Sequence, residues 1–412
     1  MDEVLIAGGG FAASMAAMRL LQLGFQPRLL IGGRPDIGGI EILPAAVHPL
    51  LAALELGPAL AELGPSCAIG LVRRWTRSGP EFRPGHALHV ERLALRRRML
   101  DEATRRGAAI ERVERLSQAP ETRGGGVRYE GRDYVAALDA TGRRAAWSRP
   151  ILRYARTRAD VFSVPVAAAL PYGVVTQLPR GWAYRADHEG AATIGIIGSP
   201  GPPSDRLPDD VAAAFDLPDA RSAAYLGRRP AFAQAAGSPL RGRVVAIGDA
   251  AFAHDPIGGR GLSFALGSAF AAAAAVRTLR ERPEDAAAAM LYYRRYVESE
   301  QARHLAFLQD FYAGAPVRPP LALPDTLGWR GAVQSTALNF DDGVRIGDAV
   351  RLSDGGWARW LGRFDLLRLR DICGGGRPLA EVLARLTESG LSADHAKMLL
   401  LWALEKGLVG RC

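Results

Sequence analysis

The sequence predicts an α/β protein in which a parallel-sheet domain carries an inserted antiparallel β-sheet and precedes a small helical module. Residues 3–31 have the pattern of a strand, a glycine-rich turn, a helix and a second strand, which together form a βαβ unit. Residues 151–235 alternate polar and apolar side chains between prolines and glycines, as antiparallel strands do. Residues 340–412 contain three short amphipathic stretches of helical periodicity.

The first βαβ unit is the clearest element of the chain. Residues 4–6 form a short apolar run that is typical of a buried strand. Residues 14–23 have helical apolar spacing, and Gly24 follows at the position where helices commonly end. Residues 28–31 repeat the apolar run and predict the second parallel strand.

The remaining elements follow from the same periodicities. We expect helices over 45–64 and 93–107, a hairpin from 122 that leads into a buried strand over 134–138, a strand over 243–247, and helices over 261–277, 284–313, 363–373, 378–389 and 392–407. The expected domains are 1–150 with 236–315 for the parallel-sheet domain, 151–235 for the inserted sheet, 316–339 for a proline-marked linker, and 340–412 for a helical, winged-helix-like module.

Composition narrows the protein class. With 412 residues, of which 48% are hydrophobic and 23% charged, the chain can form two or three domains with full cores. No apolar run approaches the roughly 20 residues that span a bilayer, and residues 3–6 already form a strand, so we expect neither a membrane span nor a signal peptide. Cys67, Cys373 and Cys412 are an odd, scattered set, which predicts a reducing cytoplasm and no disulfide framework. No metal site is expected.

The positive charge is almost entirely arginine. The net charge is +9, and Lys397 and Lys406 are the only lysines. This excess either reflects base composition or favours an acidic partner or an anionic cofactor. No stripe combines basic and aromatic residues, so a nucleic-acid-binding protein is not expected.

The glycine-rich turn of the βαβ unit predicts a dinucleotide site. Gly8, Gly10 and Ala13 fit the pattern in which one glycine makes the turn, the next admits a pyrophosphate, and a small residue packs helix on strand. The alternative is a tight structural turn. The acidic residue that usually follows the second strand is missing, so Asp36 or Glu41 would bind the ribose instead, or Arg34 would stack on the adenine.

A second turn lies after the predicted strand 243–247. Asp249 offers a carboxylate for sugar-alcohol hydroxyls, although it would also suit a structural cap of the turn. The glycines within residues 256–261 leave backbone amides bare beside a flat ring, and the helix that follows presents its positive end there. Two nucleotide-binding turns far apart in the chain predict one large cofactor held at both ends, which suits FAD.

Three motifs together resemble the flavoprotein monooxygenases of the para-hydroxybenzoate hydroxylase type, and more closely their tryptophan-halogenase-like branch. They are residues 8–13, residues 139–143 (Asp-Ala-Thr-Gly-Arg) and residues 248–261, and the resemblance covers residues 1 to about 315. It implies a Rossmann-like domain in which the first motif binds the FAD pyrophosphate, the Gly-Asp carboxylate binds the ribityl chain, and the Pro-Gly segment lies along the isoalloxazine ring. The residues expected to contact FAD are Gly8, Gly10, Phe11, Ala12, Ala13, Arg34, Arg92, Asp249, Pro256, Gly258, Gly259, Gly261 and Leu262.

Two shorter matches point to the substrate side. Residues 41–44 resemble the Gly-Glu-Ser-x-x-Pro stretch of the halogenase branch, but Ile40 replaces its glycine. Trp182 and Tyr184 resemble that branch's Gly-Trp-x-Trp strand over the ring, so they would line the substrate pocket unless they are simply core aromatics.

Halogenation itself is not expected. The halogenases of this branch need a lysine in the N-terminal half and a Trp-x-Trp-x-Ile-Pro box, and this chain has no lysine before Lys397 and no such box. The closer resemblance is to flavin monooxygenases that hydroxylate a tryptophan side chain of a protein precursor during tryptophylquinone biogenesis, as for quinohemoprotein amine dehydrogenase.

That resemblance implies an FAD-dependent monooxygenase in which a flavin C4a-hydroperoxide formed from O2 hydroxylates an aromatic ring, with NAD(P)H or a partner reductase as electron source. A protein or peptide bearing the target tryptophan would be the partner. The C-terminal module supports such a macromolecular substrate, unless it is simply a stabilising tail. His254, His48 and Glu41 are the acid–base and positioning candidates, each with a structural role as the alternative.

Three other functions remain open from the sequence. The chain is alternatively a hydroxylase of a free small aromatic metabolite, an FAD-dependent reductase of isoprenoid double bonds, or a flavin-bound interaction module without catalysis. An oxygen-stable reduced flavin would favour the isoprenoid reductase.

Overall fold

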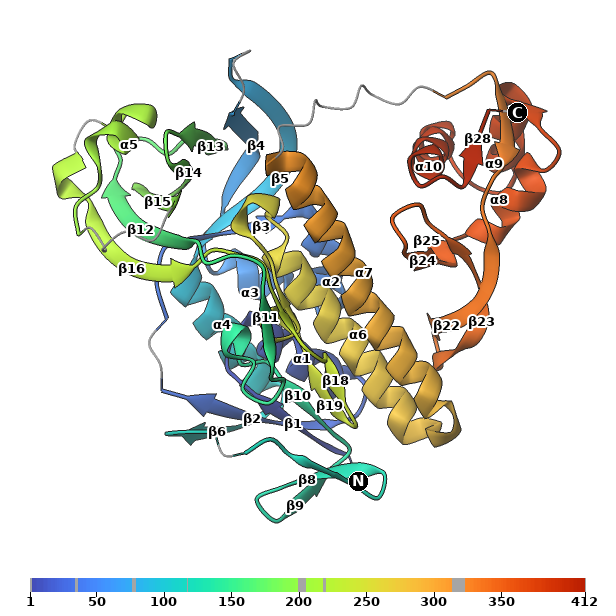
Figure 1. The fold of residues 1–412 in the computed structure, drawn as a ribbon, viewed down its shortest axis with the longest axis horizontal. Coiled ribbons are helices and arrows are strands. Elements are labelled where there is room, and N and C mark those ends of the chain that lie inside the picture. The colour runs from blue at the N-terminus through green and yellow to red at the C-terminus, as the bar shows by residue number, and fades with distance from the viewer. Residues whose placement is uncertain are drawn as a thin grey trace. The chain divides into compact units, whose positions relative to one another are not determined.

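The structure is a computed structural model that describes residues 2–33, 36–75, 79–116, 118–198, 205–217, 220–312 and 323–411. The chain divides into two compact units, Met1–Ala273 and Ala274–Cys412, which are treated separately below (Figure 1).

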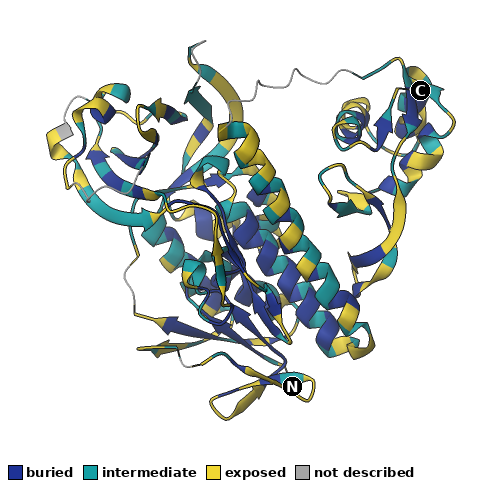
Figure 2. Ribbon diagram, viewed as in Figure 1, coloured by how far each residue is buried: buried dark blue, intermediate teal, exposed yellow. Residues whose placement is uncertain are grey.

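The first unit is built on a six-stranded, mainly parallel sheet whose strands are largely buried (Figure 2). Its order is β18-β19-β10-β1-β2-β6, and only β18 runs antiparallel to its neighbour. The predicted βαβ unit is therefore confirmed. The strands are β1 (Glu3–Ala7), β2 (Gln26–Gly32), β6 (Ala109–Val113), β10 (Ala136–Asp139), β18 (Leu240–Arg241) and β19 (Val244–Ala246).

Two helices, α1 and α4, lie against this sheet. Helix α1 (Phe11–Gln22) begins directly after the glycine turn and is buried on all sides over residues 13–18, and α4 (Arg92–Arg105) packs against it. The side chain of Glu91 caps α4 by accepting hydrogen bonds from the backbone amides of Leu93 and Ala94. Both helices lie close to their predicted bounds.

The antiparallel sheet is larger than the predicted insertion. Its order is β16-β12-β15-β14-β13-β4-β5-β3, so three strands that precede residue 151 belong to it. The sequence missed β4 and β5 because charged residues, a proline and glycines interrupt their alternation. The strands are β3 (Ile40–Pro44), β4 (Ser66–Arg74), β5 (Glu81–Glu91), β12 (Arg158–Pro165), β13 (Gly173–Leu178), β14 (Gly181–His188), β15 (Ala191–Gly198) and β16 (Ala224–Pro230).

The helix predicted over 45–64 is in fact two short helices, α2 (His48–Ala53) and α3 (Gly57–Ala61). Glu55 separates them with a left-handed φ of 55°, which no helix continues through. Smaller elements of the unit are a three-stranded sheet of β7 (Glu121–Arg123), β8 (Gly126–Tyr129) and β9 (Arg132–Tyr134), a second one of β11 (Ile151–Arg153), β17 (Gln234–Ala236) and β20 (Phe252–Ala253), and helix α5 (Asp209–Ala214).

Glu102 anchors α4 through a buried carboxylate. It accepts hydrogen bonds from Arg105 and Arg106, and Arg105 lowers the pKa of Glu102 from its ordinary value of 4.5 to about 2. Because the folded-state pKa is depressed, this contribution to stability is complete above pH 4.5 and is lost as the pH falls toward 2. At pH 7 Glu102→Gln should lower the free energy of unfolding by about 1–2 kcal/mol.

Urea titrations of both proteins at several pH values test this expectation. The difference between wild type and Glu102→Gln should shrink steadily below pH 4.5, whereas the exposed control Glu114→Gln should show almost none at any pH. A difference that persists at pH 2 would contradict the assignment.

Helix α6 (Gly261–Glu281) crosses from the first unit into the second. Among the described residues, this is the one helix that is long and apolar enough to cross a membrane. However, 67% of its most apolar 18-residue window is buried inside the protein. Such burial is typical of the core helix of a folded domain. An apolar run of this length was not expected from the sequence.

In the second unit, helix α7 (Ala286–Tyr312) packs against a hairpin of β22 (Val333–Phe340) and β23 (Gly343–Arg351). The linker predicted over 316–339 is therefore wrong in its second half, which holds β21 (Thr326–Trp329) and β22. The prolines suggested an unstructured segment, but the alternating pattern after residue 332 has an apolar partner in α7.

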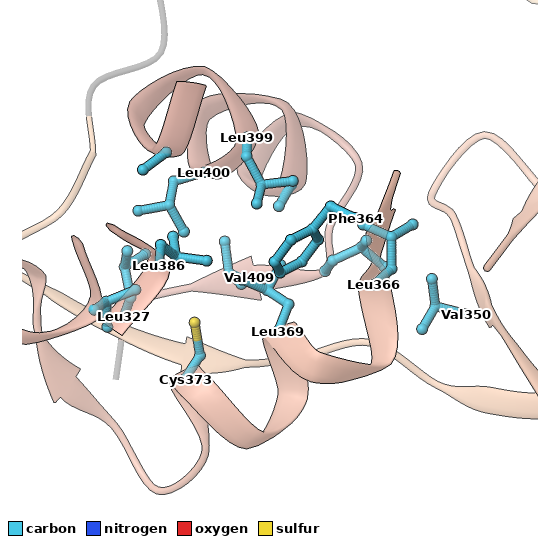
Figure 3. Close-up of a cluster of buried hydrophobic side chains, with 14 residues drawn as sticks. Leu327, Val350, Phe364, Leu366, Leu369, Cys373, Leu386, Leu399, Leu400 and Val409 are labelled. Carbon is cyan, nitrogen blue, oxygen red and sulfur yellow. The ribbon is translucent and has the colours of Figure 1, made fainter. Parts of the chain in front are cut away.

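The C-terminal module has its own core (Figure 3). Its helices α8 (Leu366–Cys373), α9 (Leu379–Glu388) and α10 (Ala393–Glu405) match the three predicted helices. They pack on a small sheet of β21, β27 (Arg377–Pro378) and β28 (Val409–Gly410). The winged-helix-like character of this module stays a prediction. Fully buried members of the core are Leu327, Val350, Leu366, Leu369, Cys373, Val382, Leu386, Ala396, Leu400, Ala403 and Leu408.

Candidate functional site

The first glycine turn joins β1 to α1, and its glycines lie in different surroundings. Gly8 has φ of +123°, and a Cβ there would lie 2.2 Å from the carbonyl oxygen of Ala140, so only glycine fits between β1 and β10. A Cβ on Gly10 would meet nothing within 4 Å, so that position faces open space. Helix α1 has neither a side-chain cap nor an acidic residue in its first turn, which leaves its N-terminal amides suited to a phosphate.

The second glycine turn touches the first. A Cβ on Gly248 would lie 2.8 Å from the Cβ of Ala12, and the backbone amide of Gly248 donates to Ser268 Oγ at 2.9 Å. Two turns more than two hundred residues apart in sequence are therefore neighbours at the carboxyl ends of β1 and β19. This edge of a parallel sheet is where nucleotides bind in α/β folds.

Asp249 lies beside Arg143 at this edge. The Asp249 carboxylate is 41% exposed, and Arg143 Nε lies 3.7 Å from its Oδ2. Arg143 also donates to the backbone oxygens of Phe232 and His254, at 2.6 and 2.8 Å. Burial lowers the pKa of Arg143, and Asp249 and Asp255 oppose that shift, so the three charges share one region of the structure.

The segment after Asp255 presents bare backbone. The Asp255 side chain accepts a hydrogen bond from the amide of Ile257 at 3.0 Å and so holds the turn Pro256–Gly258. Gly259 has a left-handed φ of 59°, and Cβ atoms on Gly259 or Gly261 would meet nothing within 4 Å. Like Gly10, these positions border a space that a flat ring can enter, and Gly261 begins α6.

Arg92 connects several residues that the sequence singled out separately. Its Nη1 donates to Glu41 Oε2 at 2.8 Å, and its Nε lies 3.7 Å from Asp36 Oδ2. Glu41 raises the pKa of Arg92 above its ordinary value, and this effect is larger than the opposing effect of burial. The same pKa is raised by Asp36, Asp249 and Tyr184, which therefore lie within electrostatic range of the guanidinium. Both acidic candidates for the ribose are thus paired with one arginine.

Sequence reasoning missed two arginines of this region. Arg96 donates from Nε to the backbone oxygen of Gly9 at 2.9 Å and lies 3.5 Å from Asp36. Its spacing of four residues from Arg92 places both on one face of α4, which was the available signal. Arg143 belongs to the Asp-Ala-Thr-Gly-Arg motif, but no contact with the cofactor or substrate was predicted for it.

Trp182 and Tyr184 lie on the same face of β14. Trp182 is 3% exposed and belongs to a cluster that includes Trp75, at 6.2 Å between ring centroids, and Ile257. Tyr184 lies in the same cluster, and its hydroxyl accepts a hydrogen bond from Arg229 at 2.6 Å. This aromatic face therefore packs next to the Pro-Gly segment. A substrate-pocket role for Trp182 and Tyr184 stays a prediction, as does the alternative that they are core aromatics.

The predicted histidines lie in different surroundings. The His254 ring is buried between Phe252 and Phe264, at centroid distances of 4.7 and 5.3 Å, which suits a packing role. His48 begins α2, and its Nε2 is buried without a hydrogen-bond partner in the described part of the chain. Their acid–base roles stay predictions. Arg34 lies outside the described residues.

Asp139 of the Asp-Ala-Thr-Gly-Arg motif is a structural residue. It is fully buried, and its Oδ1 accepts hydrogen bonds from the amide and hydroxyl of Thr141 at 3.1 and 2.6 Å. Its Oδ2 accepts from the Trp147 amide and the Ser148 hydroxyl, both at 2.8 Å. The carboxylate thereby fixes the loop that carries Arg143.

Solved structures share this architecture, although no protein-family model and no curated protein matches the sequence. The peptidyl tryptophan dihydroxylase QhpG, described as essential for tryptophylquinone cofactor biogenesis, is 23% identical, with a TM-score of 0.67 over 98% of this chain and 99% of its own. The flavin-dependent halogenase CmlS is 16% identical, with a TM-score of 0.71 over 99% of this chain and 95% of its own. The chain has the fold of these flavin-dependent enzymes.

A third similar structure matches a smaller share of both chains. The tryptophan 5-halogenase MibH is 17% identical, with a TM-score of 0.60 over 78% of this chain and 74% of its own. The predicted fold class and the resemblance stated from the three motifs are therefore confirmed at the level of the fold.

Proposed function

We propose that the protein is an FAD-dependent monooxygenase that hydroxylates a tryptophan side chain of a protein precursor during tryptophylquinone biogenesis. The observation that carries the proposal is the fold shared with a peptidyl tryptophan dihydroxylase over 98% of this chain and 99% of the other. That coverage includes the C-terminal module, but the halogenase CmlS matches the module as well, so the choice of reaction needs the residues considered below.

FAD fits the residues at the sheet edge. The uncapped start of α1 suits the pyrophosphate, the Asp249 carboxylate suits ribityl hydroxyls, and the open Cβ positions of Gly259 and Gly261 suit a flat ring. When bound, the flavin supplies the activation of O2 with electrons from NAD(P)H or a partner reductase.

The chain's own residues would bind and orient the substrate. Tyr184, which is half-buried, offers its ring to an indole, the buried Trp182 packs beside it at 6.2 Å between ring centroids, and Arg229 donates to the Tyr184 hydroxyl. Glu41 accepts a hydrogen bond from Arg92 at 2.8 Å, and its side chain would position a ring N–H. His48 Nε2 is buried and has no hydrogen-bond partner among the described residues, so a polar group of a bound substrate would supply the missing partner.

Hydroxylation is favoured over halogenation by composition. Lys397 and Lys406 are the only lysines, and both lie in the C-terminal module. The structure resembles halogenases as strongly as the dihydroxylase, so this choice depends on the residues and not on the fold.

The test is mass spectrometry of a tryptophan-bearing precursor of a tryptophylquinone subunit, incubated with the full-length protein, FAD, NADH, a flavin reductase, chloride and air. We expect a gain of one or two oxygen atoms, localised to tryptophan and absent with Asp249→Ala. The exposed control Asp133→Ala should behave like wild type. A chlorine gain, or no gain from a protein that holds FAD stoichiometrically, would overturn the proposal.

A further inference from the structure

A concave surface lined by arginines lies beside the candidate flavin site, within the first unit. It encloses about 630 Å³, and its lining includes Arg143, Arg144, Arg153, Arg156 and Arg158. Of these, Arg143 is neutralised by Asp249 and bound to backbone carbonyls. The name arginine rim is used for the other four, Arg144, Arg153, Arg156 and Arg158.

The arginine rim forms no ion pair within the part of the chain that the structure describes. All four side chains are exposed, and none forms an ion pair or hydrogen bond with another side chain or carbonyl in the described ranges. Most other arginines of the first unit have such partners, as the pairs Arg28–Glu111, Arg98–Glu62 and Arg228–Asp160 illustrate. Four like charges around one hollow raise the local potential and favour a multivalent anion over a neutral ligand.

The backbone beside the rim favours an extended chain. Strand β11 (Ile151–Arg153) is an edge strand of the β11-β17-β20 sheet, so its outer backbone edge is open to another strand. Leu152 and Tyr154 are 51% and 43% exposed on this edge. Arg153, Arg156 and Arg158 follow one another along the same stretch, which spans at most about 20 Å when extended.

We propose that the arginine rim and β11 form a docking site for an acidic, extended segment of the protein substrate. Glutamate or aspartate side chains would pair with the rim, and the backbone of the segment would add to β11. The inference deepens the proposed function, because the bound segment would belong to the protein that carries the target tryptophan. The site is adjacent to Arg143 and Asp249, so docking there would bring that protein close to the flavin.

Direct binding tests the site without any redox step. The probe is fluorescein-labelled octaglutamate, titrated by anisotropy against the full-length protein, with octaserine as the uncharged comparison. We expect salt-sensitive binding of octaglutamate only. The rim variant, which carries Arg153→Glu, Arg156→Glu and Arg158→Glu, should bind octaglutamate roughly 30-fold more weakly. The matched control carries Arg112→Glu, Arg115→Glu and Arg132→Glu, which change the net charge equally at exposed positions outside the rim.

Several results would overturn the docking site. Equal octaglutamate affinity for wild type and the rim variant, or equal weakening in both triple variants, would show that the rim is not the site. Displacement of octaglutamate by NADPH, with the rim variant losing NADPH affinity, would instead assign the hollow to a dinucleotide.

A kinetic measurement separates this inference from the proposed function. A tryptophan peptide with an acidic extension should have a roughly tenfold lower KM than the same peptide without it, at equal kcat, and the rim variant should abolish that difference. If no peptide gains oxygen but octaglutamate binding still depends on the rim, the docking site stands and the proposed reaction fails. If peptides gain oxygen with a KM that the extension and the rim do not change, the reaction stands and the docking site fails.

Discussion

A Gly261→Trp variant is expected to fold normally and to lose FAD. A Cβ at this position would meet no atom within 4 Å, and Gly261 has no left-handed φ, so a side chain can be attached there without straining the helix start. The same space is where the flavin ring is proposed to lie, and an indole there would exclude it. We expect FAD affinity to fall more than about 100-fold, equivalent to about 3 kcal/mol, with the melting temperature of the FAD-free protein almost unchanged.

Gly57→Trp is the matched control for this variant. Gly57 is also the first residue of a helix, has an ordinary φ, and faces open space. Flavin absorbance of the purified proteins and calorimetric titration with FAD compare the two variants. Wild-type FAD affinity in Gly261→Trp would place the flavin elsewhere, whereas FAD loss in both variants would point to a general folding defect.

Asp139→Ala should be the most destabilising single polar substitution of the first unit. It would leave two backbone amides and two hydroxyls of the buried 139–148 loop without their common acceptor. Each unsatisfied buried donor is costly, so we expect a loss of about 4 kcal/mol and a fall in melting temperature of about 10 °C. Because the loop carries Arg143, FAD affinity should fall as well.

Denaturant unfolding and differential scanning calorimetry measure this effect. Asp133→Ala, an exposed substitution six residues earlier, should stay within about 0.5 kcal/mol of wild type. A loss below about 1 kcal/mol for Asp139→Ala would mean that the loop finds other acceptors.

The parts of the fold with strong local signals could be predicted from the sequence. The βαβ unit, the glycine turns, α4 and the C-terminal helices all lie near their predicted bounds because periodicity and caps define them locally. The extent of the antiparallel sheet could not be predicted, since β4 and β5 join it through long-range pairing with β13 and β3 and not through alternation.

The candidate site, too, could be predicted only in part from the sequence. Gly10, Gly259 and Asp249 could be singled out because each residue type carries its own chemical reason. The joining of Arg92 to Glu41 and Asp36, and of Arg96 to Gly9, could not be predicted, because these contacts bring together elements that only the tertiary fold makes adjacent.

The buried thiol in the C-terminal module offers a chemical way to follow that module alone. Cys373 is fully covered by the leucines of its core, whereas Cys67 is exposed on β4. A thiol-alkylating reagent therefore labels Cys67 from the folded state but reaches Cys373 only when the module opens. Peptide-resolved labelling rates at Cys373 would report the opening free energy of this module within the intact chain, and any change in that rate on adding a protein substrate would show whether the module senses it.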